Sequence, residues 1–344
     1  MHRSLGGSTS PRPLPPAVRL APLVLAALLA AAVPGCRGNE GDGTVRYRIA
    51  LVPKGATHEH WQSVHAGARK AVAELAGRGV EVELFWNGPL REDDREQQIQ
   101  VVEGFITRGV DGLGLAPLDS RALVRPVEEA MRAGIAVLIF DSALDTPDIV
   151  SYVATDNYRG GTLAAARLGD VMKGKGRVLM LRYQEGSAAT EEREAGFLDR
   201  MREGYPDITV ISSNQYAGAT RDTARRASEN LLNRHAHEIE GIFTPNESST
   251  HGMLLALQDI RRAGRVAFVG FDTSAVFVEA MGRGELQGFV VQNPVNMGYL
   301  SVMTLVDHLQ GREVPKKIDT GVELVTPDNL DEPRIRKLLT RSVE

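Results

Sequence analysis

The chain lacks several features that whole classes of protein require. It has one cysteine in 344 residues, Cys36, so it can form neither an internal disulfide framework nor a cysteine-based metal cluster. It has no excess of positive charge: the net charge is −4, and because residues 1–35 contain three arginines and no acid, the remainder carries −7. Nucleic-acid binding needs a basic face, so we expect no nucleic-acid partner. The sequence also has no P-loop, no nucleophile elbow and no strand-anchored dinucleotide fingerprint.

The N-terminal segment has the pattern of an export signal. Three arginines precede an apolar run at Leu20–Ala32, which is shorter than the roughly 20 residues that span a bilayer. The run ends at residues 33–36 (VPGC), which resemble a bacterial lipobox, although Pro34 departs from the usual small residue. We therefore predict a lipoprotein signal peptide at 1–35, attachment to the membrane through an acylated Cys36, and a flexible tether at 36–45. The alternative is a conventional signal peptide followed by an incidental cysteine.

From residue 47 onward, short β-type runs alternate with amphipathic helical stretches. Apolar strands joined by helical crossovers are typical of parallel sheets that are covered on both faces. The pattern restarts after Asp156, so we predict an α/β protein with two doubly wound parallel-sheet lobes. The predicted strands are 47–52, 80–86, 112–116 and 135–140 in the first series, and 177–181, 209–213, 241–244, 266–271 and 288–292 in the second.

The residues directly after each strand are the candidates for a site, because ligands of doubly wound folds bind beyond the carboxyl ends of the strands. In this chain they are mostly charged or amide side chains, with one aromatic ring. Such groups suit a ligand with many hydroxyls, since each hydroxyl both donates and accepts a hydrogen bond, and a Trp face can cover the C–H side of a sugar. The predicted ligand-binding residues are Lys54, His58, His60, Trp61, Asp141, Glu191, Arg193, Asn246, Asp272 and Gln292.

Each of these residues also has a purely structural interpretation. Asn246 and Asp272 could cap the helices that follow them, as Asn and Asp after a strand often do. Trp61 could belong to the hydrophobic core, and Glu191 and Arg193 could lie on an exposed first helical turn. The predicted site therefore depends on the shared topological position of these residues rather than on any one of them.

Several stretches of the chain together resemble one known family. They are RIALVPKG, VEGFITRGVDGLGLAPLDS, GIAVLIFDS, VATDNYRGG, GIFTPNESS, VAFVGFD and GFVVQNP. Over about residues 46–330 the chain is similar to the periplasmic binding proteins of the ribose, rhamnose and autoinducer-2 receptor group. The resemblance implies a type I periplasmic binding fold that captures a sugar or sugar-like polyol and delivers it to the permease of an ABC importer. We expect an extracytoplasmic monomer with no cofactor and no bound metal.

The resemblance also implies roles for particular residues. Positions that commonly bind ligand hydroxyls in this group are matched by Asp141, Asn246, Asp272 and Gln292. Lys54 matches a lysine of the rhamnose and autoinducer receptors. Trp61 falls where ribose receptors stack an aromatic ring on the sugar, and His60 replaces a second aromatic ring there. Glu191 stands where ribose receptors have a ligand-binding arginine, with Arg193 nearby.

The family places the hinge between the lobes at three chain crossings. In this chain they are expected near Thr155–Asp156, Gln292–Pro294 and Glu323–Leu324, and Pro294 is consistent with a crossing because it cannot extend a central strand. The predicted N-terminal lobe is therefore 46–155 with 293–322, and the C-terminal lobe is 156–292 with 323–330. Residues 331–344 are predicted to form a C-terminal tail.

Three other functions compete with solute transport. An enzyme could use Asp141, Glu191 and Glu247 as a carboxylate pair for glycoside cleavage, and a zinc receptor could use the His-x-His pairs at 58–60 and 235–237. The spacing of each pair on a helix points the two rings apart. A receptor that feeds a sensor kinase or a chemoreceptor uses the same body, and nothing in the sequence separates that role from transport. A DNA-binding repressor is excluded, because the signal segment occupies the place of its DNA-reading helices.

Overall fold

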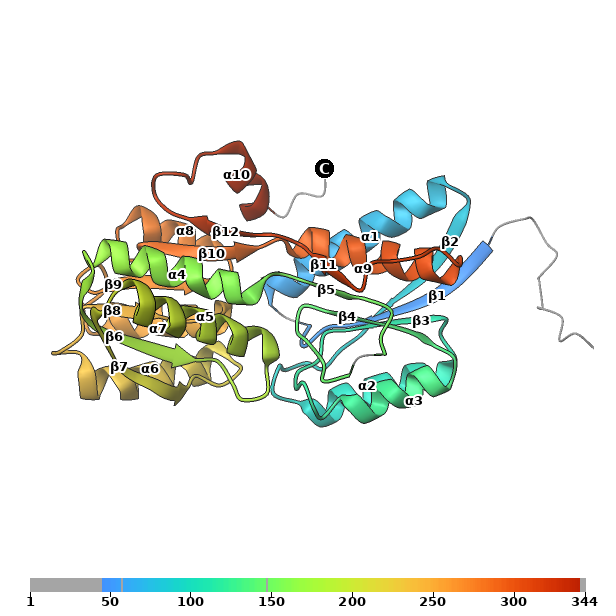
Figure 1. Cartoon of the computed structure of the whole chain (residues 1–344), viewed down its shortest axis with the longest axis horizontal. Coiled ribbons are helices and arrows are strands. Elements are labelled where there is room, and N and C mark those ends of the chain that lie inside the picture. Colours follow the sequence, from blue (N-terminus) through green and yellow to red (C-terminus); the bar gives the residue numbers. More distant parts are fainter. Residues whose placement is uncertain (1–44, 57, 147, 341–344) are drawn as a thin grey trace, which may run out of the picture. The chain divides into compact units, whose positions relative to one another are not determined.

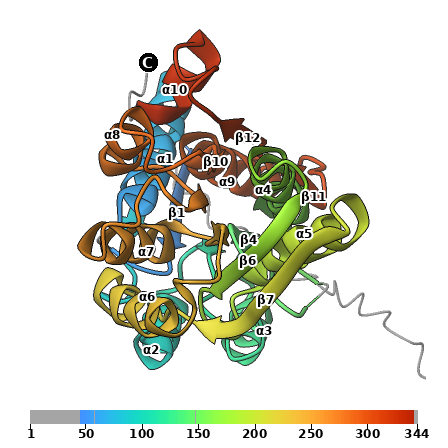
Figure 2. The ribbon, with the colours of Figure 1, turned by 90° about the vertical axis from the view of Figure 1, so that its left-hand side faces the viewer.

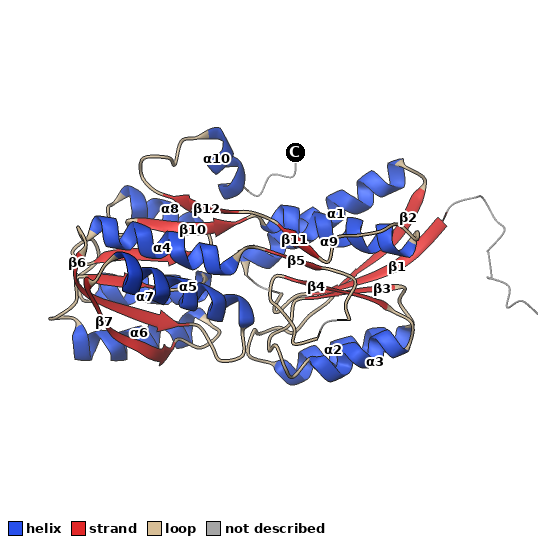
Figure 3. Cartoon of the chain, in the orientation of Figure 1, coloured by secondary structure: helices blue, strands red, loops and turns tan. Residues whose placement is uncertain are grey.

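The computed structural model describes residues 45–56, 58–146 and 148–340. The predicted signal peptide, Cys36 and all but the last residue of the predicted tether lie outside the described residues. Two six-stranded sheets form the centres of two lobes, and Figure 3 shows the helices that flank them. Among the described residues, no helix combines the length and the apolar character needed to span a membrane.

The sheet of the first lobe is entirely parallel, with helices on both faces. Its strands, in spatial order, are β11 (Lys317–Asp319), β5 (Tyr152–Ala154), β4 (Ala136–Phe140), β3 (Gly112–Leu115), β1 (Val45–Val52) and β2 (Val80–Trp86). Alternate side chains of β1 point to opposite faces: Ile49 and Leu51 pack under α1 (Glu59–Gly77) and α9 (Pro294–Leu309). Ala50 and Val52 pack under α2 (Arg95–Arg108) and α3 (Val124–Arg132) on the other face (Figure 1).

The sheet of the second lobe repeats this plan, with one antiparallel strand at its edge. Its strands, in spatial order, are β12 (Val322–Val325), β10 (Gly288–Gln292), β9 (Ala267–Phe271), β8 (Gly241–Phe243), β6 (Lys175–Arg182) and β7 (Asp207–Tyr216). One face carries α4 (Asn157–Val171) and α5 (Ala188–Gly204). The opposite face carries α6 (Arg221–His235), α7 (Glu247–Asp259), α8 (Ala275–Gly282) and α10 (Pro333–Leu339) (Figure 2).

Matching pairs of helices approach closely in each lobe because glycines face each other. A Cβ on Gly67 of α1 or on Gly298 of α9 would collide with the backbone of the other helix. The same holds for Gly161 of α4 and Gly196 of α5 in the second lobe. A Cβ on Gly161 would meet the carbonyl oxygen of Arg193, so this close approach fixes the position of a predicted site residue.

The chain crosses between the sheets three times, and the third crossing corrects the prediction. The first two crossings lie at Thr155–Asp156 and around Asn293, as expected. The third lies at Thr320–Gly321, because residues 322–325 form β12 and pair with β10, Val322 lying opposite Gln292. Glu323–Leu324 therefore lies inside a strand of the second lobe and not at the crossing. Gly321, the residue directly before β12, has a φ of 90°, a backbone conformation that glycine adopts readily.

The described part of the predicted tail belongs to the second lobe. Residues 333–339 form α10, and Ile335 is fully buried in the core under α6, α7 and α8. From here on, lobe 1 denotes residues 45–155 with 293–319, and lobe 2 denotes residues 156–292 with 322–340.

Candidate ligand-binding site

A small cavity lies where side chains at the carboxyl ends of both sheets meet. Every predicted ligand-binding residue except Glu191 lines it. The lining residues are Lys54, His58, His60, Trp61, Glu92 and Asp141 from lobe 1, Ala189, Thr190, Arg193, Asn246, Glu247 and Asp272 from lobe 2, and Gln292 at a crossing. Its volume is about 40 Å³, because charged side chains of the two lobes fill much of the space between them.

A larger hollow of about 1180 Å³ adjoins this cavity between α1 and α9 of lobe 1 and α8 and α10 of lobe 2. His60, Asp272 and Gln292 line both spaces. We place the candidate site in the smaller cavity, because only there do buried ionised groups of both lobes converge among the described residues.

A buried ion pair forms the lobe 1 side of the site. Lys54 Nζ lies 3.0 Å from Asp141 Oδ2, and the two side chains are 5% and 6% exposed. His60 Nε2 lies 3.3 Å from Asp141 Oδ1, in a contact that lacks hydrogen-bond geometry. Burial alone would raise the pKa of Asp141, but the charge of Lys54, followed by the contact with His60 and the charge of Arg193, holds this pKa well below its usual range. Asp141 is therefore an ionised acceptor.

Glu92 is a second buried carboxylate on this side, and sequence reasoning missed it. Its Oε1 lies 2.7 Å from His58 Nδ1 and accepts a hydrogen bond of 2.6 Å from Trp61 Nε1. Its Oε2 accepts one of 2.6 Å from the hydroxyl of Tyr183. Burial alone would raise the pKa of Glu92, but the hydrogen bond and charge of His58 and the bonds from Tyr183 and Trp61 lower it to about 2.

Trp61 belongs to the hydrophobic core and also borders the cavity. It is 3% exposed and packs in the lobe 1 core against Phe140, at 6.4 Å between ring centroids. It also lines the cavity, with its indole N–H held by Glu92. Stacking of Trp61 on a ligand stays a prediction.

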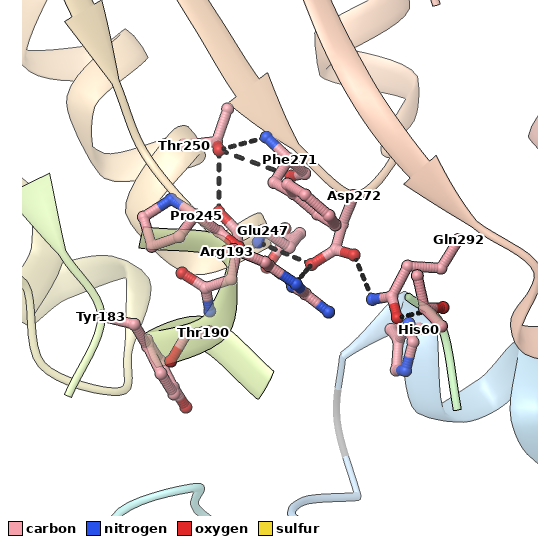
Figure 4. A network of polar contacts seen from close by, with 12 residues as sticks. His60, Tyr183, Thr190, Arg193, Pro245, Glu247, Thr250, Phe271, Asp272 and Gln292 are labelled. Carbon is pink, nitrogen blue, oxygen red and sulfur yellow. Dashed lines mark hydrogen bonds and ion pairs between the residues drawn. The ribbon is translucent and has the colours of Figure 1, made fainter. Parts of the chain in front are cut away.

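On the lobe 2 side, an ion pair and a hydrogen bond link Arg193, Asp272 and Gln292 (Figure 4). Asp272 Oδ1 accepts from Gln292 Nε2 at 2.7 Å, and Asp272 Oδ2 lies 3.9 Å from Arg193 Nη1. Arg193 is 2% exposed and donates to Asn157 Oδ1 at 2.9 Å and to the carbonyl of Pro245 at 3.0 Å. Arg193 therefore has a fixed position in the interior and does not lie on an exposed helical turn.

Asn246 and Asp272 differ in the structural role that each one plays. Asn246 is the N-cap of α7, where its side chain accepts from the backbone of Ser249, and it lines the cavity as well. Asp272 does not cap the helix that follows it, because the N-cap of α8 is Ser274. Instead Asp272 Oδ2 accepts a hydrogen bond of 3.0 Å from the backbone N–H of Glu247, the first residue of α7.

Glu191 is the predicted site residue that the structure does not bring to the cavity. Thr190 and Arg193 of α5 line the cavity, and Glu191 lies next to Thr190 on a different side of the helix. Its carboxylate instead accepts a hydrogen bond of 2.9 Å from the backbone N–H of Gly186. Glu191 therefore shapes the loop before α5, and it forms no carboxylate pair with Asp141 in the cavity.

In the two histidine pairs that suggested a zinc site, three of the histidines contact carboxylates. His58 pairs with Glu92, His60 contacts Asp141, and His235 Nδ1 lies 2.6 Å from Glu238 Oε1. In the part of the chain that the structure describes, no group of three or more His, Cys, Asp and Glu side chains is arranged to hold a metal ion.

Two α/β lobes with three crossings and a polar cavity between them define a two-lobed binding protein. Residues 49–313 match the model of the periplasmic binding protein domain, and the chain belongs to this family. It is 30% identical to the D-ribose/D-allose-binding protein of Pseudomonas aeruginosa, over 81% of this chain and 88% of that protein.

Solved structures agree with this assignment. A carbohydrate transporter solute-binding protein from Agrobacterium radiobacter, in complex with D-arabinose, superposes with a TM-score of 0.80 at 30% identity, covering 86% of this chain and 99% of that one. The periplasmic component of an ABC-type sugar transport system from Hahella chejuensis gives a TM-score of 0.76 at 36% identity, covering 81% and 99%. The predicted fold and family are thus confirmed.

Proposed function

We propose that this protein binds a sugar or sugar-like polyol between its lobes, outside the cytoplasm, and delivers it to the permease of an ABC importer. The observation that carries the proposal is the meeting of two pairs of oppositely charged side chains in one cavity: Lys54 with Asp141 from lobe 1, and Arg193 with Asp272 from lobe 2. Of the relatives described above, the Pseudomonas protein is named for binding D-ribose and D-allose, and the Agrobacterium protein was solved with D-arabinose. The Agrobacterium and Hahella proteins are named as parts of carbohydrate or sugar transport systems.

The chemistry of the cavity favours a polyhydroxylated ligand. Asp141 and Asp272 supply carboxylate acceptors, Lys54 and Arg193 supply donors, and Gln292 supplies an amide. A sugar hydroxyl can donate to a carboxylate and accept from a cation at the same time. Such charge-assisted hydrogen bonds are stronger than neutral ones, and the protein groups keep their positions through contacts of their own.

Ligand entry requires the lobes to separate. A cavity of about 40 Å³ has room for roughly three water molecules, so a sugar ring can enter only when the two lobes move apart at the three crossings. Thr155, Gln292 and Thr320, one from each crossing, are joined through their side chains at 3.0 and 3.3 Å. We propose that the crossings move as one hinge, and that the closed form is the one that the permease recognises.

We also propose that Cys36 is acylated and that the mature protein is a monomer held at the membrane surface. The motif VPGC at residues 33–36 and the polar segment after it support the anchor. We propose further that the protein acts by binding and catalyses no reaction, because its relatives are named as binding proteins.

The proposal is tested by thermal denaturation with a panel of D-ribose, D-allose, D-arabinose, hexoses and polyols. A ligand at one hundred times its dissociation constant adds about 2.7 kcal/mol to the free energy of unfolding, which raises the melting temperature measurably. Asp141→Asn serves as the control, because it keeps the shape of the site and removes an acceptor, so the same sugar should shift its melting temperature less. If no polyhydroxylated compound stabilises the wild type, the proposal is wrong.

A further inference from the structure

Glu92 stands out because both of its carboxylate oxygens already have protein partners. The residue lies in the loop between β2 and α2, and its side chain is 8% exposed. Oε1 contacts His58 Nδ1 and Trp61 Nε1, both from the start of α1 in lobe 1. Oε2 accepts from the hydroxyl of Tyr183. A sugar hydroxyl can reach this carboxylate only by displacing one of these donors, so its role differs from that of Asp141.

The bond to Tyr183 joins the two lobes. Tyr183 follows β6 of lobe 2 and is 1% exposed, and its hydroxyl donates to Glu92 at 2.6 Å. The neighbouring side chain strengthens the connection, because Gln184 Nε2 donates to the backbone carbonyl of Glu92 at 3.1 Å. Gly55 makes room for Glu92: a Cβ at position 55 would lie 2.8 Å from Glu92 Cγ.

Other hydrogen bonds between the lobes involve Ser187 and Ala189 at the start of α5 and are longer. Lys54 Nζ donates to Ser187 Oγ at 3.3 Å, and the backbone N–H of Ala189 donates to Ser142 Oγ at 3.0 Å. The bond from Tyr183 to Glu92 is shorter and has an ionised, almost fully buried acceptor. Hydrogen bonds to charged acceptors are the stronger class, and burial strengthens them further.

Separation of the lobes removes the lobe 2 partners of Glu92, which are Tyr183 and Gln184, and leaves its lobe 1 partners in place. His58 and Trp61 move with Glu92 because all three belong to lobe 1, whereas Tyr183 moves away with lobe 2. The two lobe 1 partners therefore keep the carboxylate ionised and correctly oriented in either arrangement. The acceptor for Tyr183 is preorganised, so no side chain of lobe 1 must be reordered when the lobes meet.

We propose that Glu92 and Tyr183 form a latch that holds the two lobes together independently of the ligand, so that the protein closes for a measurable share of the time with no ligand bound. The inference rests on the hinge motion contained in the proposed function, and it does not depend on which ligand is bound. His58 and Trp61 are positioning residues of the latch. They hold the Glu92 carboxylate so that Oε2 faces Tyr183.

The test measures the distance between the lobes without ligand. Spin labels are placed on the full-length Cys36→Ser protein at Glu128→Cys of α3 and Arg226→Cys of α6, two exposed positions in different lobes. Pulsed electron-spin resonance then gives the populations of the shorter and longer distances. The test variant is Tyr183→Phe, which removes only the hydroxyl and leaves Glu92 Oε2 without a donor in the closed form.

The matched control is Tyr205→Phe. Tyr205 lies in the same lobe and donates to a carboxylate, Asp170 Oδ1, at 2.7 Å, but this bond stays within lobe 2. We expect a detectable closed population in the wild type and in Tyr205→Phe. In Tyr183→Phe the ratio of closed to open protein should fall by about ten- to a hundredfold, with the melting temperature checked to confirm that the variant folds.

Two results would overturn the proposal. One is a wild type with no closed population in the absence of ligand, and the other is a Tyr183→Phe protein whose distances match those of Tyr205→Phe. Neither result depends on sugar binding, so a failure of the latch is distinct from a failure of the proposed function. Conversely, if the protein shows the latch but binds no sugar, the latch is supported and the proposed function is wrong.

Discussion

Replacing Asp141 by asparagine tests the centre of the site most directly. Asp141 and Lys54 are both almost fully buried, 3.0 Å apart. In Asp141→Asn the charge is lost, while the shape is kept and the left-handed backbone at this position, with φ at 63°, still suits the residue. The Lys54 ammonium is then left buried beside a neutral amide. Removing one partner of a buried ion pair typically costs about 3–5 kcal/mol, and we expect a loss of that size in the free energy of unfolding at pH 7.

The same ion pair predicts how this loss varies with pH. Because folding depresses the pKa of Asp141 from its usual 3.8, the carboxylate contributes stability above the pKa of the unfolded chain and loses it as the pH falls toward the folded pKa. The difference in unfolding free energy between wild type and Asp141→Asn should be constant above about pH 5 and shrink below about pH 4.

Urea denaturation of four proteins separates the pair from its surroundings: the wild type, Asp141→Asn, Lys54→Met and the double variant. The double variant should lose less unfolding free energy than the two single variants lose together, because it leaves no unpaired buried charge. Asp307→Asn is the control, since Asp307 pairs with Arg312 at the surface, and its loss should stay within about 0.5 kcal/mol. If Asp141→Asn lowers the free energy of unfolding no more than this control does, the charge of Lys54 is not stabilised by Asp141, and the assignment of a buried ion pair is wrong.

Three further predictions concern separate parts of the chain. Burial lowers the pKa of His58, but the hydrogen bond and charge of Glu92, with a contribution from Glu247, outweigh burial and the charge of Arg221, so the pKa is raised. The stability that this histidine contributes is therefore complete below about pH 6.5 and is lost as the pH rises through the folded pKa. In urea denaturation, the stability of His58→Gln should lack this fall with rising pH. Gly161→Ala should lower the melting temperature markedly because its Cβ meets the Arg193 backbone, whereas Gly104→Ala in α2, where the Cβ meets nothing, should raise stability by up to about 1 kcal/mol. Cys36→Ser should move the protein from the membrane fraction to the soluble or unprocessed fraction, and a wild type found wholly in the soluble fraction would exclude the anchor.

Local patterns were enough to predict most of the fold. Apolar runs separated by amphipathic stretches predicted both sheets, because strands that are buried on both faces must be apolar throughout. Three short strands were missed, β5, β11 and β12: β5 and β11 have three residues each, and β11, at the edge of its sheet, exposes Lys317 and Asp319. The third crossing was misplaced because its position depends on the pairing of β12 with β10, which no local pattern encodes.

Site residues could be predicted where their position follows from the end of a strand. They could not be predicted where their position depends on tertiary packing. Residues that directly follow a strand, such as Lys54 and Asp141, reach the cavity because the strand ends there. Glu92 lies in a loop, and its partners Trp61 and Tyr183 are 31 and 91 residues away. Glu191 has the right distance from its strand but lies on the wrong side of α5. The signal that could have found Glu92 is an acidic side chain in the loop after β2, at the same edge of the sheet as the other residues.

Both lobes use the same backbone device to present a carboxylate, and they differ in how they neutralise it. Asp141 follows β4 and Asp272 follows β9, with φ of 63° and 66°, and the backbone N–H of each bonds to the neighbouring strand, at Val153 and Val290. Non-glycine residues with positive φ are uncommon, and aspartate is among the types that tolerate it. In lobe 1 the charge has a direct cationic partner at 3.0 Å, whereas in lobe 2 it is balanced by a backbone N–H, an amide and an arginine at 3.9 Å. Because its cation is farther away, we expect Asp272 to exchange a neutral partner for a ligand hydroxyl at lower cost than Asp141, so that a ligand bound in the cavity would rearrange the hydrogen bonds of lobe 2 more readily than those of lobe 1.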